Sequence, residues 1–268
     1  MARNDARSSA IMAAGTLVSR ILGFVKTILL TVAIGSLSTV GDVFETANTL
    51  PNLIYVLVAG GVFNAVLVPQ IIKAAKAQDG GARYISKLVT LTVTAIGLIT
   101  LITVACAWPI ISIMGSGWSP EQRQLGVIFS LWCLPQIFFY GLYTVIGQVL
   151  NAKDAFGAYM WSPVLNNVIT ILSLFLFIFL FGAQTPNPNP IHTVASWTNA
   201  QTLVLAGSST FGVIMQALVL FIPLRKLGLR LKPDFAWRGI GLRAASKLAA
   251  WTLASGIISN LAFLYMTK

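Results

Sequence analysis

Long apolar segments separated by short polar connections run along the whole chain. A helix rises about 1.5 Å per residue, so each segment is long enough to cross a hydrocarbon core roughly 30 Å thick. The pattern predicts seven such helices, at residues 10–35, 43–72, 88–114, 125–150, 158–182, 203–224 and 244–266. The chain is therefore predicted to be an all-α polytopic membrane protein.

Composition indicates the same class. Hydrophobic residues make up 56% of the chain and charged residues only 9%, whereas an average soluble domain has roughly 25% charged residues. The net charge of +11 is compatible with nucleic-acid binding. However, the basic residues cluster in the short connections between apolar segments, where they set membrane orientation. No nucleic-acid partner is predicted.

The basic residues also predict which ends of the helices are cytoplasmic. With the N-terminus inside, the cytoplasmic connections hold 14 of the 18 Lys and Arg residues, and the outer ones keep only Arg123 and Lys268. The positive-inside rule therefore predicts a multi-pass protein of the plasma membrane with a cytoplasmic N-terminus. The first segment is too long and too charged for a cleavable signal, so it is predicted to remain as a helix.

Two cations, Arg20 and Lys26, lie inside the first apolar segment. If the helix begins near residue 10, Arg20 lies about 15 Å along it, close to the middle of the bilayer. A cation at that depth costs about 2.5–3.5 kcal/mol on insertion scales, so it is predicted to face protein or water. Arg20 and Lys26 are therefore candidate substrate-binding residues for an anion.

Polar residues recur with helical spacing in the first two segments. The residues that share a face are Thr16, Arg20, Gly23 and Thr27 in the first, and Glu45, Asn48, Thr49, Asn52 and Tyr55 in the second. If the two helices form an antiparallel hairpin, Lys26 and Asn52 both lie roughly 13 Å below the outer surface. This shared depth predicts a single site, with Asn52 and Tyr55 as further substrate-binding residues.

Asp42 and Glu45 are predicted to lie near the outer mouth of the first two spans and to be the counter-charges of these cations. Two interpretations remain open. One is a permanent structural ion pair with Lys26, and the other is a gate in which that pair forms and breaks.

Three prolines inside the predicted helices are candidate kink residues. Pro51, Pro135 and Pro163 each remove a backbone donor, which favours a kink and leaves a carbonyl free. Asn166 and Asn167 follow Pro163 and are predicted to bond either a polar ligand or a neighbouring helix. Several broken, polar-lined helices are typical of a transporter that alternates between two states.

The remaining polar segments suggest no catalytic chemistry. Residues 183–202 contain the only histidine, His192, and are interpreted as a solvated connector. Residues 227–243 are basic and amphipathic, which fits either a linker lying on the membrane surface or a solvated loop. Cys106 and Cys133 lack metal-type spacing, so no metal, cofactor, disulfide or catalytic residue is predicted.

Three stretches carry a resemblance to a known family. They are GTLVSRILGFVKTILLTVAIG, then GD at positions 41–42, then LPNLIYVLVAGGVFNAVLVPQ. Together with SPVLNN later in the chain, they resemble the start of the MurJ/MviN family of lipid II flippases, within the multidrug/oligosaccharidyl-lipid/polysaccharide exporter superfamily. The details are most similar to the actinobacterial branch.

The resemblance implies two helical lobes around a cationic cavity. Such a protein carries undecaprenyl-linked lipid II, the peptidoglycan precursor, outward across the plasma membrane by alternating access. The resemblance places Arg20 on a cavity arginine, Lys26 on a second basic site and Asp42 on an acid after the first helix. It implies lipid II and the bilayer as partners, with cell-wall synthesis or division proteins as further candidates.

The chain departs from the family in length and in three positions. The family continues well beyond a seventh span, so the chain is predicted to be an N-terminal fragment. The predicted organisation is a six-helix lobe at 1–226, a basic linker at 227–243 and the first helix of a second lobe at 244–268. Relatives often have an arginine at the position of Tyr55, an acid at that of Thr27 and a glutamate at that of Gly60. The contacts with the substrate are therefore expected to differ in detail.

Other function classes stay open. A drug or cation exporter, or another polysaccharide-lipid exporter of the same superfamily, would share the helices and kinks, although two cations favour an anionic substrate. A non-transporting scaffold for cell-wall assembly would need no polar cavity. An enzyme is the least favoured class, because one histidine and seven acids offer little for acid-base or metal chemistry.

Overall fold

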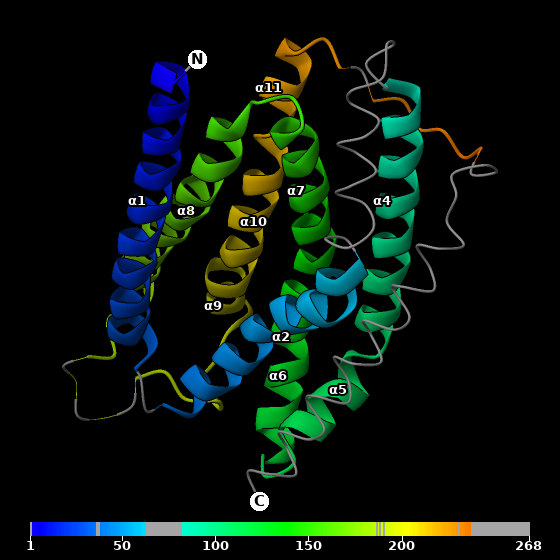
Figure 1. Cartoon of the computed structure of the whole chain (residues 1–268). Helices are drawn as coiled ribbons and strands as arrows, with labels where there is room; N and C mark the ends of the chain where they lie inside the picture. The colour runs from blue at the N-terminus through cyan, green and yellow to red at the C-terminus, as the bar shows by residue number, and fades with distance from the viewer. Residues whose placement is uncertain are drawn as a thin grey trace, which may run out of the picture.

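The computed structural model describes residues 2–35, 38–62, 82–185, 187, 189, 191–229 and 231–236. Every regular element in these ranges is a helix, which confirms the all-α prediction (Figure 1). In chain order the elements are α1 (Ala2–Ile34), α2 (Thr39–Val62), α4 (Ala82–Ala105), α5 (Ala107–Met114), α6 (Pro120–Cys133), α7 (Gln136–Asn151), α8 (Phe156–Phe181), α9 (Asn199–Thr202), the π-helical turn η2 (Leu203–Gly207), α10 (Ser208–Leu218) and α11 (Phe221–Lys226).

Five helical stretches are long and apolar enough to cross a membrane. They are residues 10–34, 82–105, 120–151, 156–181 and 199–226. Each overlaps one of the segments predicted from the sequence. α2 covers the first part of the segment predicted at 43–72 and is less apolar than these five. The segment predicted at 244–266 lies outside the described residues.

Two of the predicted helices are interrupted where a proline removes a backbone donor. The segment predicted at 88–114 consists of α4 and α5, with Cys106 between them at φ −93° and ψ 15°. Pro109 follows in the first turn of α5 and lacks the N–H that a continuous helix would need. α6 and α7 are likewise separate helices on either side of Leu134 and Pro135. Together they still form one stretch of membrane-spanning length.

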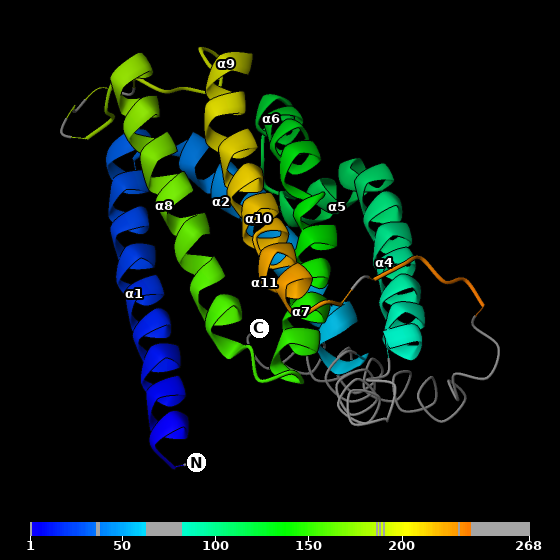
Figure 2. The ribbon, with the colours of Figure 1, turned by 90° about the horizontal axis from the view of Figure 1, so that it is seen from above.

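The helix α1 stands at the edge of the bundle. Its main neighbour is α8, which also packs on α10, whereas α2 packs on α6 and α7, and α4 packs on α7. Figures 1 and 2 both show α1 and α8 side by side, with α2 diverging from α1 after their short connection. The expected antiparallel hairpin of the first two helices is therefore wrong. The partner of α1 is α8, which runs in the same direction and offers α1 a longer contact surface.

Two apolar clusters fill the bundle. The first joins α4, α7 and the segment from α10 to α11, and its buried members include Ile85, Leu88, Ile146, Leu150 and Leu224. The second joins the end of α1 and the start of α2 to α6 and α8, and its members include Ile34, Phe44, Phe129 and Phe177. Lipid tails are as apolar as these side chains, so close packing and interhelical hydrogen bonds stabilise such a bundle in a membrane.

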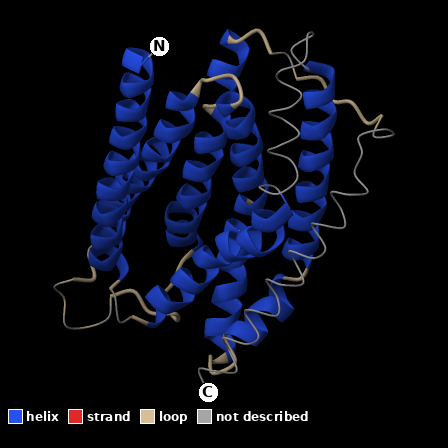
Figure 3. Cartoon of the chain, viewed as in Figure 1, coloured by secondary structure: helices blue, strands red, loops and turns tan. Residues whose placement is uncertain are grey.

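The connection from α8 to α9 is buried at two of its described residues, Gln184 and His192. His192 is only 2% exposed. Its Nε2 lies 3.1 Å from the carbonyl oxygen of Gly182, and its Nδ1 lies 3.0 Å from Nε2 of Gln201. Gln201 also closes a capping box with Thr198 at the start of α9. The interpretation of this loop as a solvated connector is therefore wrong at His192, which links α8 to α9. Figure 3 shows the described loops at the ends of the helices.

The chain beyond α11 continues without a helix over residues 231–236. The backbone N–H of Asp234 donates to Oγ1 of Thr90 at 3.0 Å, and its carboxylate lies 3.7 Å from Nε of Arg83. Both partners belong to α4, so this part of the predicted linker is tied to the beginning of that helix.

Candidate functional site

One face of α1 is fixed against α8. The indole Nε1 of Trp161 donates to the carbonyl of Ile11 at 3.3 Å, and Nδ2 of Asn167 donates to the carbonyl of Ser19 at 2.8 Å. Gly15 lies against the ring of Trp161, where a Cβ would approach within 3.0 Å. These contacts set the rotation of α1 and hence the direction in which its other side chains point.

Arg20 lies outside this contact face and is exposed. Successive helix residues are about 100° apart, so two further sectors of α1 can be distinguished. The polar sector holds Thr16, Arg20 and Thr27, and the apolar sector holds the exposed Leu17, Ile21, Phe24 and Ile28. Among the described residues, no hydrogen bond or ion pair holds the Arg20 guanidinium. Arg20 thus lies on a polar strip between the α8 contact and a lipid-type surface.

Lys26 lies on a different face of α1. It follows Ser19 by seven residues, which returns it to the side that packs on α8, and it is half-buried. Its ammonium forms no hydrogen bond or ion pair within the part of the chain that the structure describes. Arg20 and Lys26 are therefore about a third of a turn apart around the helix and about 9 Å apart along it.

α2 carries two sets of polar side chains. The exposed set consists of Asp42, Glu45, Thr49 and Asn52. The half-buried set turns toward neighbouring helices. The hydroxyl of Tyr55 donates to Oγ1 of Thr144 on α7 at 2.6 Å, and Oδ1 of Asn48 lies 3.8 Å from Sγ of Cys133 on α6. Asn52 is thus on the exposed side of α2, whereas Tyr55 is bonded to α7.

The predicted counter-charges do not contact Lys26. Arg83 and Asp234 form the one ion pair within the described ranges, so Lys26 is paired with neither Asp42 nor Glu45 there. No hydrogen bond between described residues joins Lys26 to Asn52. A standing ion pair is therefore absent from this conformation, and a pair that forms and breaks stays a prediction.

Asn166 and Asn167 are adjacent but turn to different helices. Asn167 bonds the carbonyl of Ser19 on α1, as described above. Asn166 donates from Nδ2 to Oε1 of Gln216 on α10 at 2.9 Å, and its side chain lies over Gly212, whose missing Cβ leaves room for it. Two partners were predicted for these amides, a ligand or a neighbouring helix. The described conformation shows neighbouring helices.

The helix α8 continues through Pro163 because other donors replace the lost bond. The carbonyl left free belongs to Tyr159, four residues earlier. The hydroxyls of Tyr143 on α7 and of Ser162 each donate to that carbonyl at 3.2 Å. α2 also continues through Pro51.

A polar network at the α6–α7 junction was missed from the sequence. The hydroxyl of Thr210 on α10 donates to the carbonyl of Trp132 at 2.7 Å and accepts from Nε2 of Gln136 at 2.9 Å. The hydroxyl of Tyr140 donates to Oε1 of Gln136 at 3.1 Å. Polar residues within apolar segments were the available signal, but nothing local in the sequence pairs Gln136 with Thr210.

The exposed polar side chains of α1 and α2 are chemically suited to binding an anion. No group of three or more His, Cys, Asp or Glu side chains that could hold a metal occurs among the described residues. Arg20 presents an exposed guanidinium, and the exposed side of α2 presents the amide of Asn52 and the hydroxyl of Thr49. A guanidinium binds phosphate or carboxylate oxygens through two parallel hydrogen bonds.

Comparison with known proteins places the chain in a family. A family model described as lipid II flippase MurJ matches residues 13–268. The chain belongs to the MurJ family. The probable lipid II flippase MurJ of Synechocystis sp. is 28% identical, with 96% of this chain and 47% of that protein covered. The corresponding protein of Haemophilus influenzae is 26% identical, with 94% and 48% covered. The chain spans about half the length of these MurJ relatives.

A solved structure of a MurJ protein shows the same fold. That structure, a lipid II flippase MurJ in an inward closed conformation, is 19% identical and superposes with a TM-score of 0.62. The match covers 93% of this chain and 48% of that one. This likeness confirms the predicted polytopic helical fold, and the family model confirms the predicted family. The narrower assignment to the actinobacterial branch stays a prediction.

Proposed function

We propose that this chain forms the N-terminal half of a transporter that carries lipid II across the plasma membrane by alternating access, for peptidoglycan synthesis. The observation that carries the proposal is Arg20, an exposed guanidinium inside a membrane-spanning helix of a MurJ-family chain. Such a group is costly in lipid, but it is well suited to a water-filled cavity through which a phosphorylated headgroup passes.

In this mechanism the guanidinium of Arg20 binds the pyrophosphate of lipid II through a bidentate pair of hydrogen bonds. Lys26, on the adjacent face, supplies a mobile point charge at the end of a long side chain. Asn52 of α2 offers an amide for the sugar or peptide part of the headgroup. Every step exchanges non-covalent contacts and no covalent bond changes, so the proposed protein is a transporter and not an enzyme.

Asn166, Asn167 and Tyr55 have a second role in this proposal. Each of them bonds a neighbouring helix in the described conformation, so each would reach the substrate only by exchanging that partner. We therefore assign them to holding α8, α1 and α2 in place around the substrate path, with substrate contact restricted to other conformations.

Release of the headgroup is assigned to Asp42 and Glu45. Both are exposed on α2 and unpaired with Lys26 among the described residues. If one of them approaches Lys26 in another state, it neutralises the ammonium and weakens its hold on phosphate. The positive-inside distribution supports a cytoplasmic N-terminus. This orientation places the two acids toward the outer side.

The second wall of the proposed cavity comes from a second lobe. Coverage of about half of each relative supports this arrangement, with 1–226 as the first lobe, 227–243 as the linker and 244–268 as the beginning of the second lobe. Residues 244–268 lie outside the described residues. An association with cell-wall synthesis or division proteins stays a prediction.

The experiment replaces Arg20 in the full-length protein and measures outward exposure of lipid II. Cells depleted of their native flippase would express the parent, Arg20→Ala, Arg20→Lys or Thr16→Ala, at matched membrane levels. Loss of a charged hydrogen-bonding group costs about 1.5–3 kcal/mol, so Arg20→Ala should lower the labelling of lipid II by an impermeant outer reagent at least about tenfold. Arg20→Lys should keep part of the activity, and Thr16→Ala most of it.

Normal labelling with Arg20→Ala would overturn the proposed role of Arg20. Normal wall growth without any lipid II exposure by the parent protein would instead indicate a scaffold for cell-wall assembly.

A further inference from the structure

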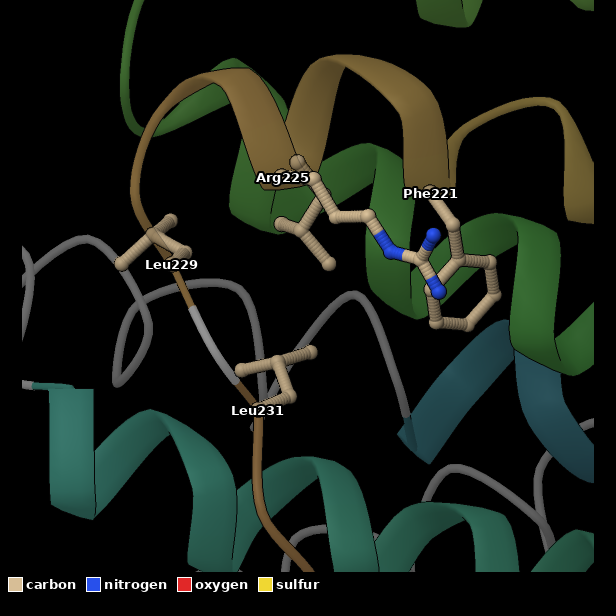
Figure 4. Close-up of a pocket in the computed structure, with 5 residues that line it drawn as sticks. Phe221, Arg225, Leu229 and Leu231 are labelled. Atoms are coloured by element: carbon tan, nitrogen blue, oxygen red, sulfur yellow. The ribbon is translucent and has the colours of Figure 1, made fainter.

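A cavity of about 520 Å³ lies between α11 and the segment that follows it. Phe221, Leu224, Arg225, Leu229 and Leu231 line it. Figure 4 shows the Arg225 side chain extending alongside the ring of Phe221, with Leu229 and Leu231 on the segment that faces them. The volume is within the range of roughly 300–1,000 Å³ typical of small-molecule sites. The cavity thus combines apolar walls with one cation.

The charge of Arg225 is not neutralised by described protein groups. The guanidinium forms no hydrogen bond or ion pair with any residue that the structure describes. Asp234, the only acid between residues 221 and 236, is already paired with Arg83. The same stretch of sequence contains three further cations, Lys226, Arg230 and Lys232. This imbalance favours an anionic occupant.

The position of the cavity indicates where that occupant comes from. α11 forms the end of the membrane-spanning stretch 199–226, so the cavity lies at the depth of lipid headgroups. In the orientation proposed above this end faces the cytoplasm, whose leaflet is rich in anionic lipids. A phosphate at the level of Arg225 would have its acyl chains on the apolar side.

We propose that this cavity binds an anionic glycerophospholipid, with its phosphate on Arg225 and the upper part of its acyl chains on Phe221, Leu224 and Leu231. The bound lipid fills the space between α11 and the segment that Asp234 ties to α4. This site is separate from Arg20 and Lys26, and it takes a structural lipid rather than the transported one. Only the leaflet from which the lipid comes rests on the proposed orientation.

The test uses the full-length protein in nanodiscs of phosphatidylcholine that contain a photoactivatable phosphatidylglycerol. After illumination, mass spectrometry identifies the labelled peptides. The parent protein should be labelled within residues 221–231. Arg225→Gln should lower this labelling about tenfold, as expected for the loss of one charge-assisted contact. Arg225→Lys should retain most of it.

Lys226→Gln is the matched control, because Lys226 is exposed and does not line the cavity. It removes the same charge one residue away and should leave the labelling unchanged. Equal losses in the Arg225→Gln and Lys226→Gln variants would mean that the basic segment attracts lipid without a site, which overturns the proposal. Equal labelling by photoactivatable phosphatidylcholine, or no labelling because a segment of the chain fills the cavity, would also overturn it.

Nanodiscs expose both membrane faces, so this result does not depend on orientation or on lipid II transport. Failure of the lipid site would leave the role of Arg20 intact, and failure of the Arg20 test would leave this site intact.

Discussion

α1 and the α6–α7 stretch both cross the membrane, but they are buried in the helical bundle to very different extents. In the most apolar part of α1 only 11% of the residues are buried, against 56% in the most apolar part of the stretch 120–151 that forms α6 and α7. Gln136 on α7 has both of its amide atoms bonded, to Thr210 and Tyr140. Arg20 on α1 is exposed. The buried amides of Gln136 and Asn167 bond helices together, whereas the exposed polar groups of α1 and α2 are those that we propose for contact with a substrate.

Among the substitutions proposed here, Gly147→Ala on α7 is expected to lower the stability of the protein most. This glycine lies directly against the ring of Tyr159, which leaves no room for a side chain. Gly147→Ala should therefore lower the free energy of unfolding by about 2 kcal/mol or more, because overpacking forces the helices apart. Thermal unfolding in detergent measures the effect.

Gly23→Ala on α1 is the control, since the nearest atom to a new Cβ there is Nδ2 of Asn167 at 4.0 Å. The melting temperature of Gly23→Ala should be close to that of the parent protein. Similar losses of thermal stability in the two variants would contradict the inference that α1 is packed less closely than α7.

A smaller loss is expected when the α6–α7 junction loses its buried amide. Gln136 is 1% exposed, and Gln136→Leu leaves the Tyr140 hydroxyl without this acceptor. The expected cost is about 1 kcal/mol, the usual scale of an interhelical hydrogen bond in a membrane protein. Gln124→Leu, at an exposed position of α6, should cost less. If the exposed replacement is the more harmful one, the network does not stabilise the junction.

The smallest stability effect is expected at Asn167, where it should be confined to one helix. Asn167→Ala removes the bond to Ser19 and should raise hydrogen exchange in α1, with a global loss of about 1 kcal/mol or less. Asn166→Ala removes the bond to Gln216, so faster exchange should appear in α10 instead. Identical exchange patterns in these two variants would show that the adjacent amides do not hold separate helices.

Five of the spans, and the position of Arg20 inside one of them, could be predicted because both are local properties. Hydropathy over about twenty residues identifies a crossing helix, and counting residues gives the depth of a charge. Which helix packs on α1 is not local. The contact between Ser19 and Asn167 joins residues 148 positions apart, and no pattern within either helix specifies it. Chain proximity favoured α2 as the partner, and side-chain packing selected α8.

Two other features were predicted wrongly although the sequence contains a signal for each. Pro109 indicates the break between α4 and α5, but the apolar residues on both sides of it favoured one continuous helix. The sequence Thr198-Asn-Ala-Gln201 is a capping-box pattern, which predicts a helix start inside the supposed connector. Burial of His192 could not be predicted, because it depends on Phe177 and Trp197 meeting around the ring.

The water accessibility of position 20 in the full-length protein shows directly whether Arg20 lines an aqueous path. Arg20→Cys and Phe24→Cys would be compared after Cys106→Ser and Cys133→Ala, using a hydrophilic thiol reagent in native membranes. Phe24 is 69% exposed but lies in the apolar sector of α1. We predict rapid reaction at position 20, slowed by lipid II, and little reaction at position 24. No reaction at position 20, or equal reaction at both positions, would contradict the account.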